Sequence, residues 1–287
     1  MTRPSYLTES AIAQFITLAL AEDIGEGDHS TLGAIPQDIT RKAKLLVKDD
    51  GILAGVEIAT KIFHQFDPNL KLEYFKQDGD DIKKGDIAFT VEGPARSILS
   101  TERLVLNCMQ RMSGIATYTK KLYKLIEGTK AQLMDTRKTT PNFRLMEKWA
   151  VAIGGGRNHR YALYDMVMLK DNHIDMAGGI SQAIANTRKY LASKNKSLKI
   201  EIETRNLNEV QQVLDAGGVD VIMLDNMNTT DMKKAVTLID GRCKTEASGG
   251  ITENNLRAVA ECGVDFISVG ALTHSVKSLD LSLKNFF

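Results

Sequence analysis

The chain has 287 residues, 43% of them hydrophobic, which is enough for one α/β barrel with an appendage or for two domains. Its 37 cationic and 36 anionic side chains leave a net charge of +1, which argues against general nucleic-acid or membrane-surface binding. It has no apolar run near the ~20 residues of a membrane span, no apolar core of a secretory signal and no cysteine pattern for zinc or disulfides, so we expect a cytoplasmic location.

The N-terminal part of the chain is predicted to form a separate α+β domain. Apolar side chains recur at helical spacing between residues 8 and 21, and Thr8 stands where an N-cap belongs. Apolar stretches predict strands over residues 41–47, 70–75 and 86–91. These elements favour a sheet packed on helices.

A long helical pattern follows, from Ser100 to Ile126. Gly114 is a predicted break in it, and we place the change of domain there. The predicted domains are residues 1–113 and a barrel over residues 114–274. The tail, residues 275–287, is expected to pack on the first domain.

Six short apolar runs in the second half each end in a charged or glycine-rich residue. Helical patterns lie between most of them, and parallel strands that alternate with helices close into a barrel. Such barrels place their chemistry at the carboxyl ends of the strands, where these charges stand. The runs are Ala131–Asp135, Asp165–Lys170, Leu198–Glu203, Val219–Asp225, Lys244–Ser248 and Val264–Gly270.

Five cations or potential cations follow three successive elements of the predicted barrel. Arg137 and Lys138 follow its first strand, His159 and Arg160 follow a helix that three glycines end, and Lys170 ends the next strand. In the predicted barrel these groups converge. For any one of them a solvated surface charge is the alternative, which is weaker for Lys170 because the preceding strand is apolar on both faces.

Carboxylates accompany these cations. Glu201 and Glu203 alternate with isoleucines, so both face one side of their strand, and a charge inside a barrel must be paired or bind something. Glu203 and Asp225 lie at strand ends, where they could accept ribose hydroxyls, hold Mg²⁺ through water or offset positive charge on a sugar carbon. Internal ion pairs with Lys170 and the arginines are the alternative.

Glycines follow the last two strands. Ser248, Gly249 and Gly250 come after one strand, and Gly270 and Ala271 after the other. Barrels often bind phosphate with these loops and a helix N-terminus, and Thr252 is a good N-cap for a helix over residues 253–262. The whole pocket suits a substrate with phosphates, carboxylates and a sugar, so a decarboxylase, an aldolase and a glycosyl transferase all fit.

Motifs along nearly the whole chain resemble those of the quinolinate phosphoribosyltransferase family. The resemblance implies an N-terminal α/β sandwich and an irregular, incomplete α/β barrel of about six or seven strands. It implies transfer of phosphoribosyl from phosphoribosyl pyrophosphate to quinolinate with decarboxylation, which gives nicotinate mononucleotide, pyrophosphate and CO2 in NAD biosynthesis. The motifs are Thr101–Asn107, Ser113–Thr117, Asp135–Pro141, Gly155–Arg160, Leu169–His173, Ile200–Glu203, Met223–Asn226, Ala247–Ile251 and Phe266–Leu272.

The resemblance also implies a role for each site residue. Arg103 would enter the partner subunit's site, so the smallest active unit would be a homodimer, with no nucleic-acid or membrane partner. Mg²⁺ would be the cofactor, held through substrate and water near Glu203 and Asp225. The implied catalytic residues are Lys138, Lys170, Glu203 and Asp225; quinolinate and the donor would meet Arg137, Lys138, His159, Arg160 and Lys170, and the 5-phosphate would meet Ser248, Gly249, Gly250, Gly270 and Ala271.

Three alternatives stay open at this point. A related phosphoribosyltransferase could act on nicotinate or another pyridine carboxylate, although several cations favour the two carboxylates of quinolinate. Lys170 could instead form a Schiff base, as in class I aldolases. A binding protein without activity is the third alternative, which the combined acidic and basic groups oppose.

Overall fold

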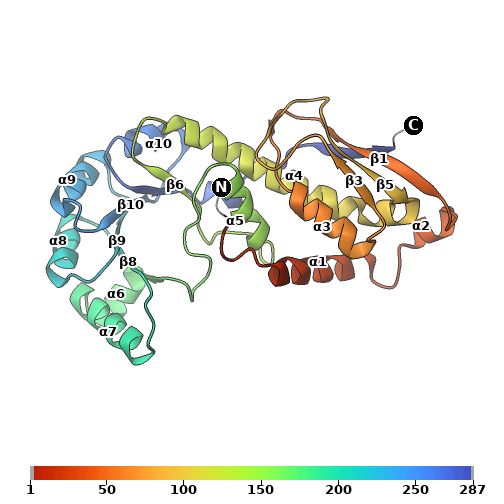
Figure 1. Cartoon of the computed structure of the whole chain (residues 1–287). Coiled ribbons are helices and arrows are strands. Elements are labelled where there is room, and N and C mark those ends of the chain that lie inside the picture. The colour runs from red at the N-terminus through yellow and green to blue at the C-terminus, as the bar shows by residue number, and fades with distance from the viewer. Residues whose placement is uncertain (1–2, 286–287) are drawn as a thin grey trace. The chain divides into compact units, whose positions relative to one another are not determined.

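The computed structural model describes residues 3–285, which form two compact units (Figure 1). Of the described residues, the first unit contains 3–120, 138–155 and 271–285. The second unit contains residues 121–137 and 156–270. The domain boundaries inferred from the sequence, 1–113 and 114–274, stay a prediction.

The first unit is built on an antiparallel four-stranded sheet in the order β12-β1-β5-β3, beside a two-stranded pair, β2 and β4. The three strands predicted here are confirmed, as is the helix after Thr8, whose hydroxyl accepts from the backbone of Ala11 at 3.1 Å. Its elements are α1 (Glu9–Ile24), α2 (His29–Ala34), β1 (Thr40–Val47), β2 (Gly51–Ile52), α3 (Val56–Phe66), β3 (Lys71–Tyr74), β4 (Asp81–Ile82), β5 (Ile87–Pro94), most of α4 (Ala95–Leu125), α5 (Arg144–Ile153), α11 (Ala271–His274) and β12 (Leu281–Asn285).

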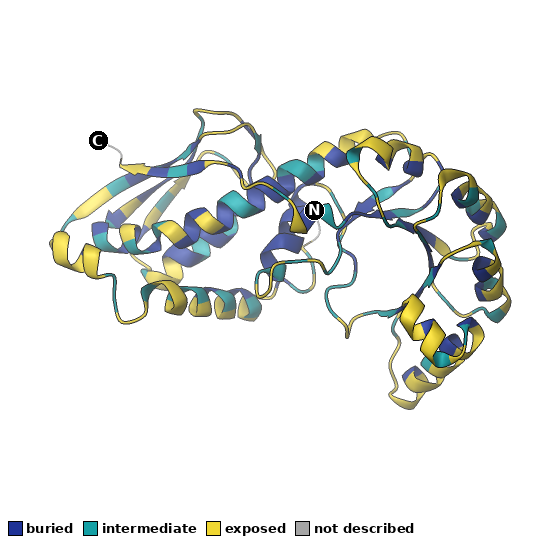
Figure 2. Cartoon of the chain, turned by 180° about the vertical axis from the view of Figure 1, so that it is seen from behind, coloured by how far each residue is buried: buried dark blue, intermediate teal, exposed yellow. Residues whose placement is uncertain are grey.

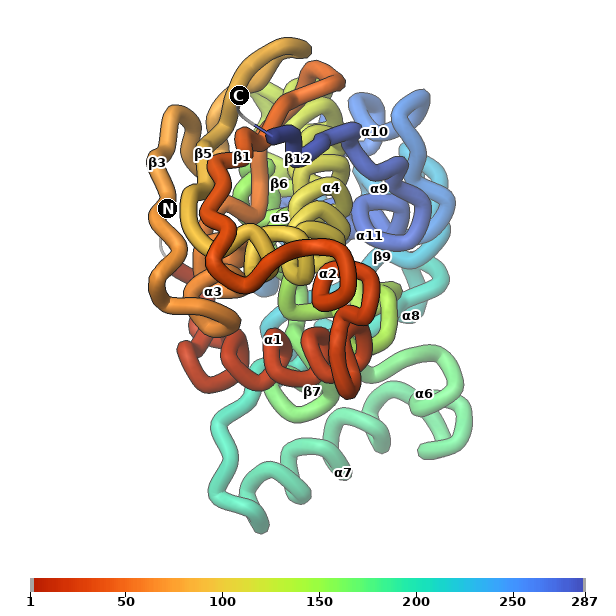
Figure 3. Tube along the Cα trace, turned by 90° about the vertical axis from the view of Figure 1, so that its right-hand side faces the viewer, coloured from red at the N-terminus to blue at the C-terminus, as the bar shows by residue number. Residues whose placement is uncertain are grey.

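The edge strand of this sheet comes from the other end of the sequence. β12 pairs antiparallel with β1, with Leu283 opposite Leu45 and Leu281 opposite Val47 (Figure 3). These four side chains are buried, so the pairing extends the apolar face of the sheet. Strand β12 is therefore part of the core of the first unit.

Helix α4 continues through Gly114, so the predicted break is wrong. A Cβ at this position would lie 3.1 Å from the Cα of Ser278 and closer still to the carbonyl oxygen of Lys277. The glycine is therefore explained by the close approach of the tail to the helix. Side-chain hydrogen bonds hold the same contact region, since Gln110 donates to the carbonyl of Leu281 at 2.8 Å.

Gly114→Ala is expected to destabilise the protein by about 1–3 kcal/mol, because the new methyl group meets backbone atoms that cannot move aside easily. In an unhindered helix the same change stabilises by about 0.5–1 kcal/mol, so the sign of the effect is informative. Gly33→Ala is the matched control, since Gly33 lies in helix α2 with open space around it. Urea unfolding should give Gly114→Ala a lower free energy of unfolding than the parent and Gly33→Ala a higher one. A Gly114→Ala variant more stable than the parent would contradict the explanation.

The second unit is a parallel six-stranded sheet in the order β6-β11-β10-β9-β8-β7. Each of its strands lies within one of the six apolar runs, which confirms the strands predicted there. The barrel is incomplete, as expected, because β6 and β7 are both edge strands. The elements are β6 (Gln132–Met134), β7 (Val167–Leu169), α6 (Asp171–Ala177), α7 (Ile180–Ser193), β8 (Ile200–Thr204), α8 (Leu207–Ala216), β9 (Val221–Asp225), α9 (Thr229–Ile239), β10 (Lys244–Ser248), α10 (Glu253–Ala260) and β11 (Phe266–Ser268).

Helices cover the outer side of this sheet and bury its central strands (Figure 2). Ile202, Ile222 and Ala247 are fully buried, which explains the near-continuous apolar runs. Edge strand β7 is less buried than the sequence predicted, because an open barrel leaves it with one neighbour. Among the described residues, no helix is both long enough and apolar enough to cross a membrane.

Candidate active site

The carboxyl ends of the parallel strands in the second unit carry a mixed set of charges. Lys170 follows β7, and its ammonium lies 3.1 Å from the Glu203 carboxylate near the end of β8. The backbone N–H of Asp171 donates to the other oxygen of Glu203 at 3.4 Å. Lys170 is half exposed whereas Glu203 is largely buried, so the pair presents its cation outward.

Arg160 lies in the same electrostatic environment. Burial, followed by the neighbouring charge of Arg137, lowers the pKa of Arg160, while Glu201, Asp165 and Glu203 oppose that shift. Two guanidinium groups that repel each other form a favourable place for an anion, because an anion relieves the repulsion. The structure thus places Arg160 near Arg137 and Glu203, and Lys170 beside Glu203. The convergence predicted for all five cations, with Lys138 and His159, stays a prediction.

Asp225 and the glycines of the next loop form a second group. Asp225 ends β9 opposite Ser248, and the side chain of Asn226 donates to it at 2.8 Å. Gly249 and Gly250 have φ values of +87° and +61°, and a Cβ at Gly249 would collide with the side chain of Asn226. The close contact with Asn226 therefore explains the glycine at position 249, and the left-handed φ of Gly250 favours glycine there.

Comparison with known proteins decides the family. The model of the quinolinate phosphoribosyl transferase N-terminal domain matches residues 27–113, and that of the C-terminal domain matches residues 115–284. The chain belongs to the quinolinate phosphoribosyltransferase family.

Relatives of this family are similar over almost the entire chain. The chloroplastic nicotinate-nucleotide pyrophosphorylase [carboxylating] of Arabidopsis thaliana is 50% identical over 94% of this chain and 81% of its own length. A probable nicotinate-nucleotide pyrophosphorylase [carboxylating] of Bacillus subtilis is 43% identical over 91% of this chain and 89% of its own. The crystal structure of NadC from Streptococcus pyogenes has a TM-score of 0.91 at 38% identity and covers 98% of this chain and 99% of that one.

Three residues to which the family resemblance gives a role lie in the first unit, and their contacts within that unit are as follows. Arg103 is largely exposed on α4 and forms an ion pair with Glu102 at 3.1 Å. The backbone carbonyl of Lys138 accepts from the hydroxyl of Thr273 at 2.8 Å, and Ala271 begins α11. Their roles stay predictions.

A buried network that the sequence did not reveal supports the Lys138 loop within the first unit. Arg111 donates to the fully buried Glu147 at 2.9 and 3.0 Å and also to the carbonyls of Thr273 and Val276. Glu147 in turn accepts from the backbone N–H and hydroxyl of Thr140 at 3.0 and 2.9 Å. One charged pair therefore ties two loops to helices α4 and α5.

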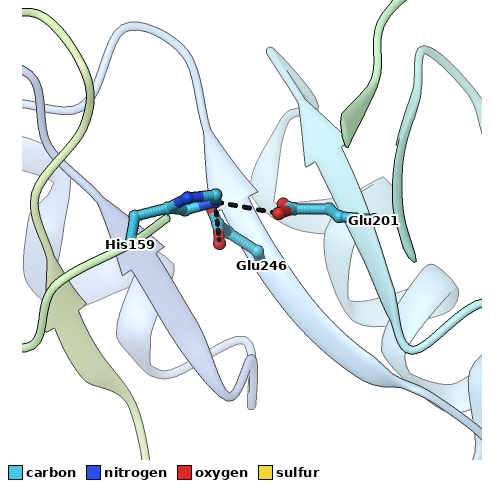
Figure 4. A group of neighbouring side chains, drawn as sticks. All are labelled: His159, Glu201 and Glu246. Atoms are coloured by element: carbon cyan, nitrogen blue, oxygen red, sulfur yellow. Dashed lines mark ion pairs between the residues drawn. The ribbon is translucent and has the colours of Figure 1, made fainter. Parts of the chain in front are cut away.

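A second cluster of polar side chains, which the sequence did not predict as a group, lies inside the open barrel. His159, Glu201 and Glu246 come from the loop after α5 and from strands β8 and β10, and Figure 4 shows their polar ends pointing toward one another. Burial raises the pKa of Glu201 to about 8. Burial, with the charge of Glu201 next, raises the pKa of Glu246 to about 8 as well. Glu246 lies in a run, Lys244–Ser248, whose alternation gave no reason to single it out.

Glu246→Gln should make the stability of the protein less dependent on pH. Because the pKa of Glu246 is higher in the folded protein than in the unfolded chain, the folded state binds more protons between about pH 4.5 and 8. The contribution of the Glu246 carboxyl to the free energy of unfolding is therefore fully present at low pH and is lost as the pH rises toward 8. The free energy of unfolding of Glu246→Gln, relative to that of the parent, should therefore rise by up to about 1.4 kcal/mol per pH unit in that range.

Urea unfolding at pH 5, 6.5 and 8 measures this difference, with the exposed Glu127→Gln as control. A difference between Glu246→Gln and the parent that stays constant with pH would contradict the expectation.

Proposed function

We propose that this chain transfers the phosphoribosyl group from phosphoribosyl pyrophosphate to quinolinate with loss of CO2, and so makes nicotinate mononucleotide for NAD biosynthesis. The observation that carries the proposal is the cation-rich group of Arg137, Arg160 and Lys170 at the strand ends of a chain in this family. Quinolinate has two carboxylates, and the donor has a 5-phosphate and a pyrophosphate. Both substrates are therefore anions that a group of cationic side chains can bind.

Glu203 and Asp225 provide negative charge in the sugar-transfer step. Pyrophosphate leaves the anomeric carbon of the donor through an oxocarbenium-like state, and the pyridine nitrogen of quinolinate attacks that carbon. Carboxylates fixed at the ends of β8 and β9 favour the cationic sugar without reorganising. Lys170 holds Glu203 in place and, with the arginines, offsets the charge that builds on pyrophosphate.

The decarboxylation that follows needs little from the protein. The new ring nitrogen is positive, so it stabilises the carbanion left on the adjacent ring carbon when the carboxylate departs as CO2. A proton from water then takes the place of the carboxylate on that carbon. Arginine suits the binding of the ring carboxylates because its planar fork can bind a carboxylate through two parallel hydrogen bonds. In addition to offsetting charge on pyrophosphate, Arg137 and Arg160 would then orient the ring.

Mg²⁺ is part of this proposal. The chemistry of the donor set fits it, since Glu203 and Asp225 offer the hard carboxylate oxygens that Mg²⁺ prefers, and they end neighbouring strands. Bound through these residues, water and the donor, Mg²⁺ would neutralise charge on the pyrophosphate.

We also propose a homodimer in which Arg103 acts in the site of the neighbouring subunit. The guanidinium of Arg103 is largely exposed and pairs with the adjacent Glu102, and such a group can reach outward from α4. A cytoplasmic location remains part of the proposal; relatives include proteins named as chloroplastic and mitochondrial.

Two other activities fit the site less well. A Schiff-base aldolase would use the free amine of Lys170, whereas the ion pair with Glu203 uses the ammonium form. Transfer to another pyridine carboxylate differs only in the acceptor, and one ring carboxylate would leave part of the cationic group unused.

Product analysis tests the function directly. The protein is incubated with quinolinate, phosphoribosyl pyrophosphate and Mg²⁺, and CO2, pyrophosphate and nicotinate mononucleotide are measured together. Equal amounts of the three products are expected. Turnover of nicotinate but not quinolinate would support the other acceptor, and trapping of a carbonyl substrate by borohydride at Lys170 would support the aldolase.

A further inference from the structure

Helix α4 carries an arginine whose hydrogen-bonding groups are used almost entirely within the first unit. Nε and Nη2 of Arg111 donate to Oε1 of Glu147 at 3.0 and 2.9 Å. Nη1 donates to the carbonyl of Val276 at 2.8 Å, and Nη2 also donates to the carbonyl of Thr273. These bonds use four of the five N–H groups of the guanidinium. Arg111 therefore has little capacity left for a substrate anion.

Glu147 on α5 is satisfied just as fully. Its side chain is 0% exposed, and that of Arg111 is 22% exposed. Oε1 of Glu147 also accepts from the hydroxyl of Thr140 at 2.9 Å, and Oε2 accepts from the backbone N–H of Thr140 at 3.0 Å. The carboxylate therefore connects helix α5 to the loop that precedes it.

The two helices that carry this ion pair are in direct backbone contact. A Cβ on Gly154, at the end of α5, would lie 2.7 Å from the Cβ of Thr119 on α4 and closer still to the carbonyl oxygen of Ala116. No side chain fits between the helices at this point, so they cannot shift easily relative to each other. The ion pair is thus attached to a fixed frame.

Lys138 lies where the two segments held by the ion pair meet. Thr273, fully buried on α11, donates its hydroxyl to the carbonyl of Lys138 at 2.8 Å, and its own carbonyl accepts from Arg111. Thr140, two residues after Lys138, donates twice to Glu147. The backbone of Lys138 is therefore held by groups that the ion pair itself fixes.

Stability alone does not require this arrangement. A buried ion pair is often no more stable than apolar side chains of similar volume, because both charges lose their contact with water. Charged groups differ in that their hydrogen bonds have direction. Arg111 and Glu147 hold two carbonyls, a hydroxyl and a backbone N–H in one geometry, which apolar side chains cannot do.

We infer that Arg111 and Glu147 are positioning residues, which fix the backbone of Lys138 through Thr140 and Thr273 so that the ammonium of Lys138 meets quinolinate in one orientation. The inference rests on the proposed function for the role of Lys138. Neither member of the pair touches the substrate in this assignment; both act through the loop.

Hydrogen exchange tests whether the ion pair holds the loop. The backbone N–H of Thr140 donates to Glu147, so its exchange rate reports directly on the loop. Arg111→Lys keeps a cation beside Glu147 but loses the fork that also reaches two carbonyls. The N–H of Thr140 should then exchange about tenfold faster, while the N–H groups of β5 exchange as in the parent.

An unchanged exchange rate at Thr140 would overturn the inference, and an equal increase throughout β5 would show a general loss of stability and contradict it. If Arg111→Lys does not fold, exchange of the same N–H in Thr140→Val decides in its place. The measurement needs no substrate, so it shows whether the pair holds the loop even if the proposed activity fails.

Steady-state kinetics tests the link to quinolinate. Thr140→Val keeps the branched shape and the backbone bond to Glu147 but removes the hydroxyl that donates to Oε1. KM for quinolinate should rise about tenfold. KM for phosphoribosyl pyrophosphate should stay within about twofold, because the loops implied for its 5-phosphate begin at Ser248 and Gly270, outside the loop of Thr140.

Thr140→Ser retains the hydroxyl and should restore most of the affinity for quinolinate. Thr237→Val is the matched control, since its hydroxyl donates to the carbonyl of Lys233 on the exposed side of α9, and it should behave as the parent does. Equal increases in both KM values, or no rescue by serine, would contradict the positioning role. A parent protein that does not turn over quinolinate would instead contradict the proposed function.

Discussion

Arg137→Ala is expected to weaken quinolinate binding by roughly 2–5 kcal/mol, or about 30- to 4,000-fold in Kd. Arg137 is half-buried beside Arg160, where removal of one guanidinium leaves a ring carboxylate without its fork-shaped partner. Arg137→Lys keeps the charge but loses the fork, so an intermediate affinity is expected. Lys138→Ala is also expected to lose quinolinate binding, because the family resemblance implies that Lys138 contacts this substrate.

Calorimetry with quinolinate alone measures these affinities, and thermal unfolding checks that the fold is intact. Lys234→Ala, a largely exposed cation on α9, is the control and should bind as the parent does. Unchanged affinity in Arg137→Ala would remove Arg137 from the site.

Mixing two inactive variants, Arg103→Ala and Lys170→Ala, is expected to restore about a quarter of the parent activity. In a dimer with shared sites, half of the randomly exchanged dimers contain one subunit of each kind. One of the two sites in such a dimer then has both Lys170 and the partner subunit's Arg103, and the other site has neither.

The experiment requires subunit exchange, which a tagged variant and affinity capture confirm. Each variant alone should have less than about 1% of the parent activity, since one charged group that stabilises the transition state typically contributes 10²–10³-fold. Exchanged dimers without recovered activity would contradict the shared site. Recovery in a mixture of Lys170→Ala with Glu203→Ala is not expected, because both residues lie in one ion pair of the same subunit.

Regular patterns made much of the fold predictable. The apolar runs at Leu198–Glu203 and Val219–Asp225 contain β8 and β9 because buried parallel strands leave a strong sequence signal. Gly114 was misread because a helix-breaking residue and a residue that admits a neighbouring backbone look identical without the neighbour. The neighbour, at Lys277 and Ser278, is more than 160 residues away in the sequence.

The site was predictable where charge follows a strand. Lys170, Glu203 and Asp225 stand at strand ends, so the rule that sites lie at the carboxyl ends locates them. Glu246 lies within its strand, where charge gives no hint of the partner opposite. Its contact with His159 depends on how the parallel sheet brings a loop after α5 beside β10, which no local pattern contains.

The pairing of β12 with β1 constrains the order of events during synthesis. During synthesis, β1 cannot pair with β12 until residues 281–285 have left the ribosome, more than 230 residues after β1 itself. Until then one edge of the growing sheet is open to other chains, and unpaired strand edges are sites of aggregation. The slow closure of so long a loop makes this enzyme a candidate for chaperone assistance in the cell.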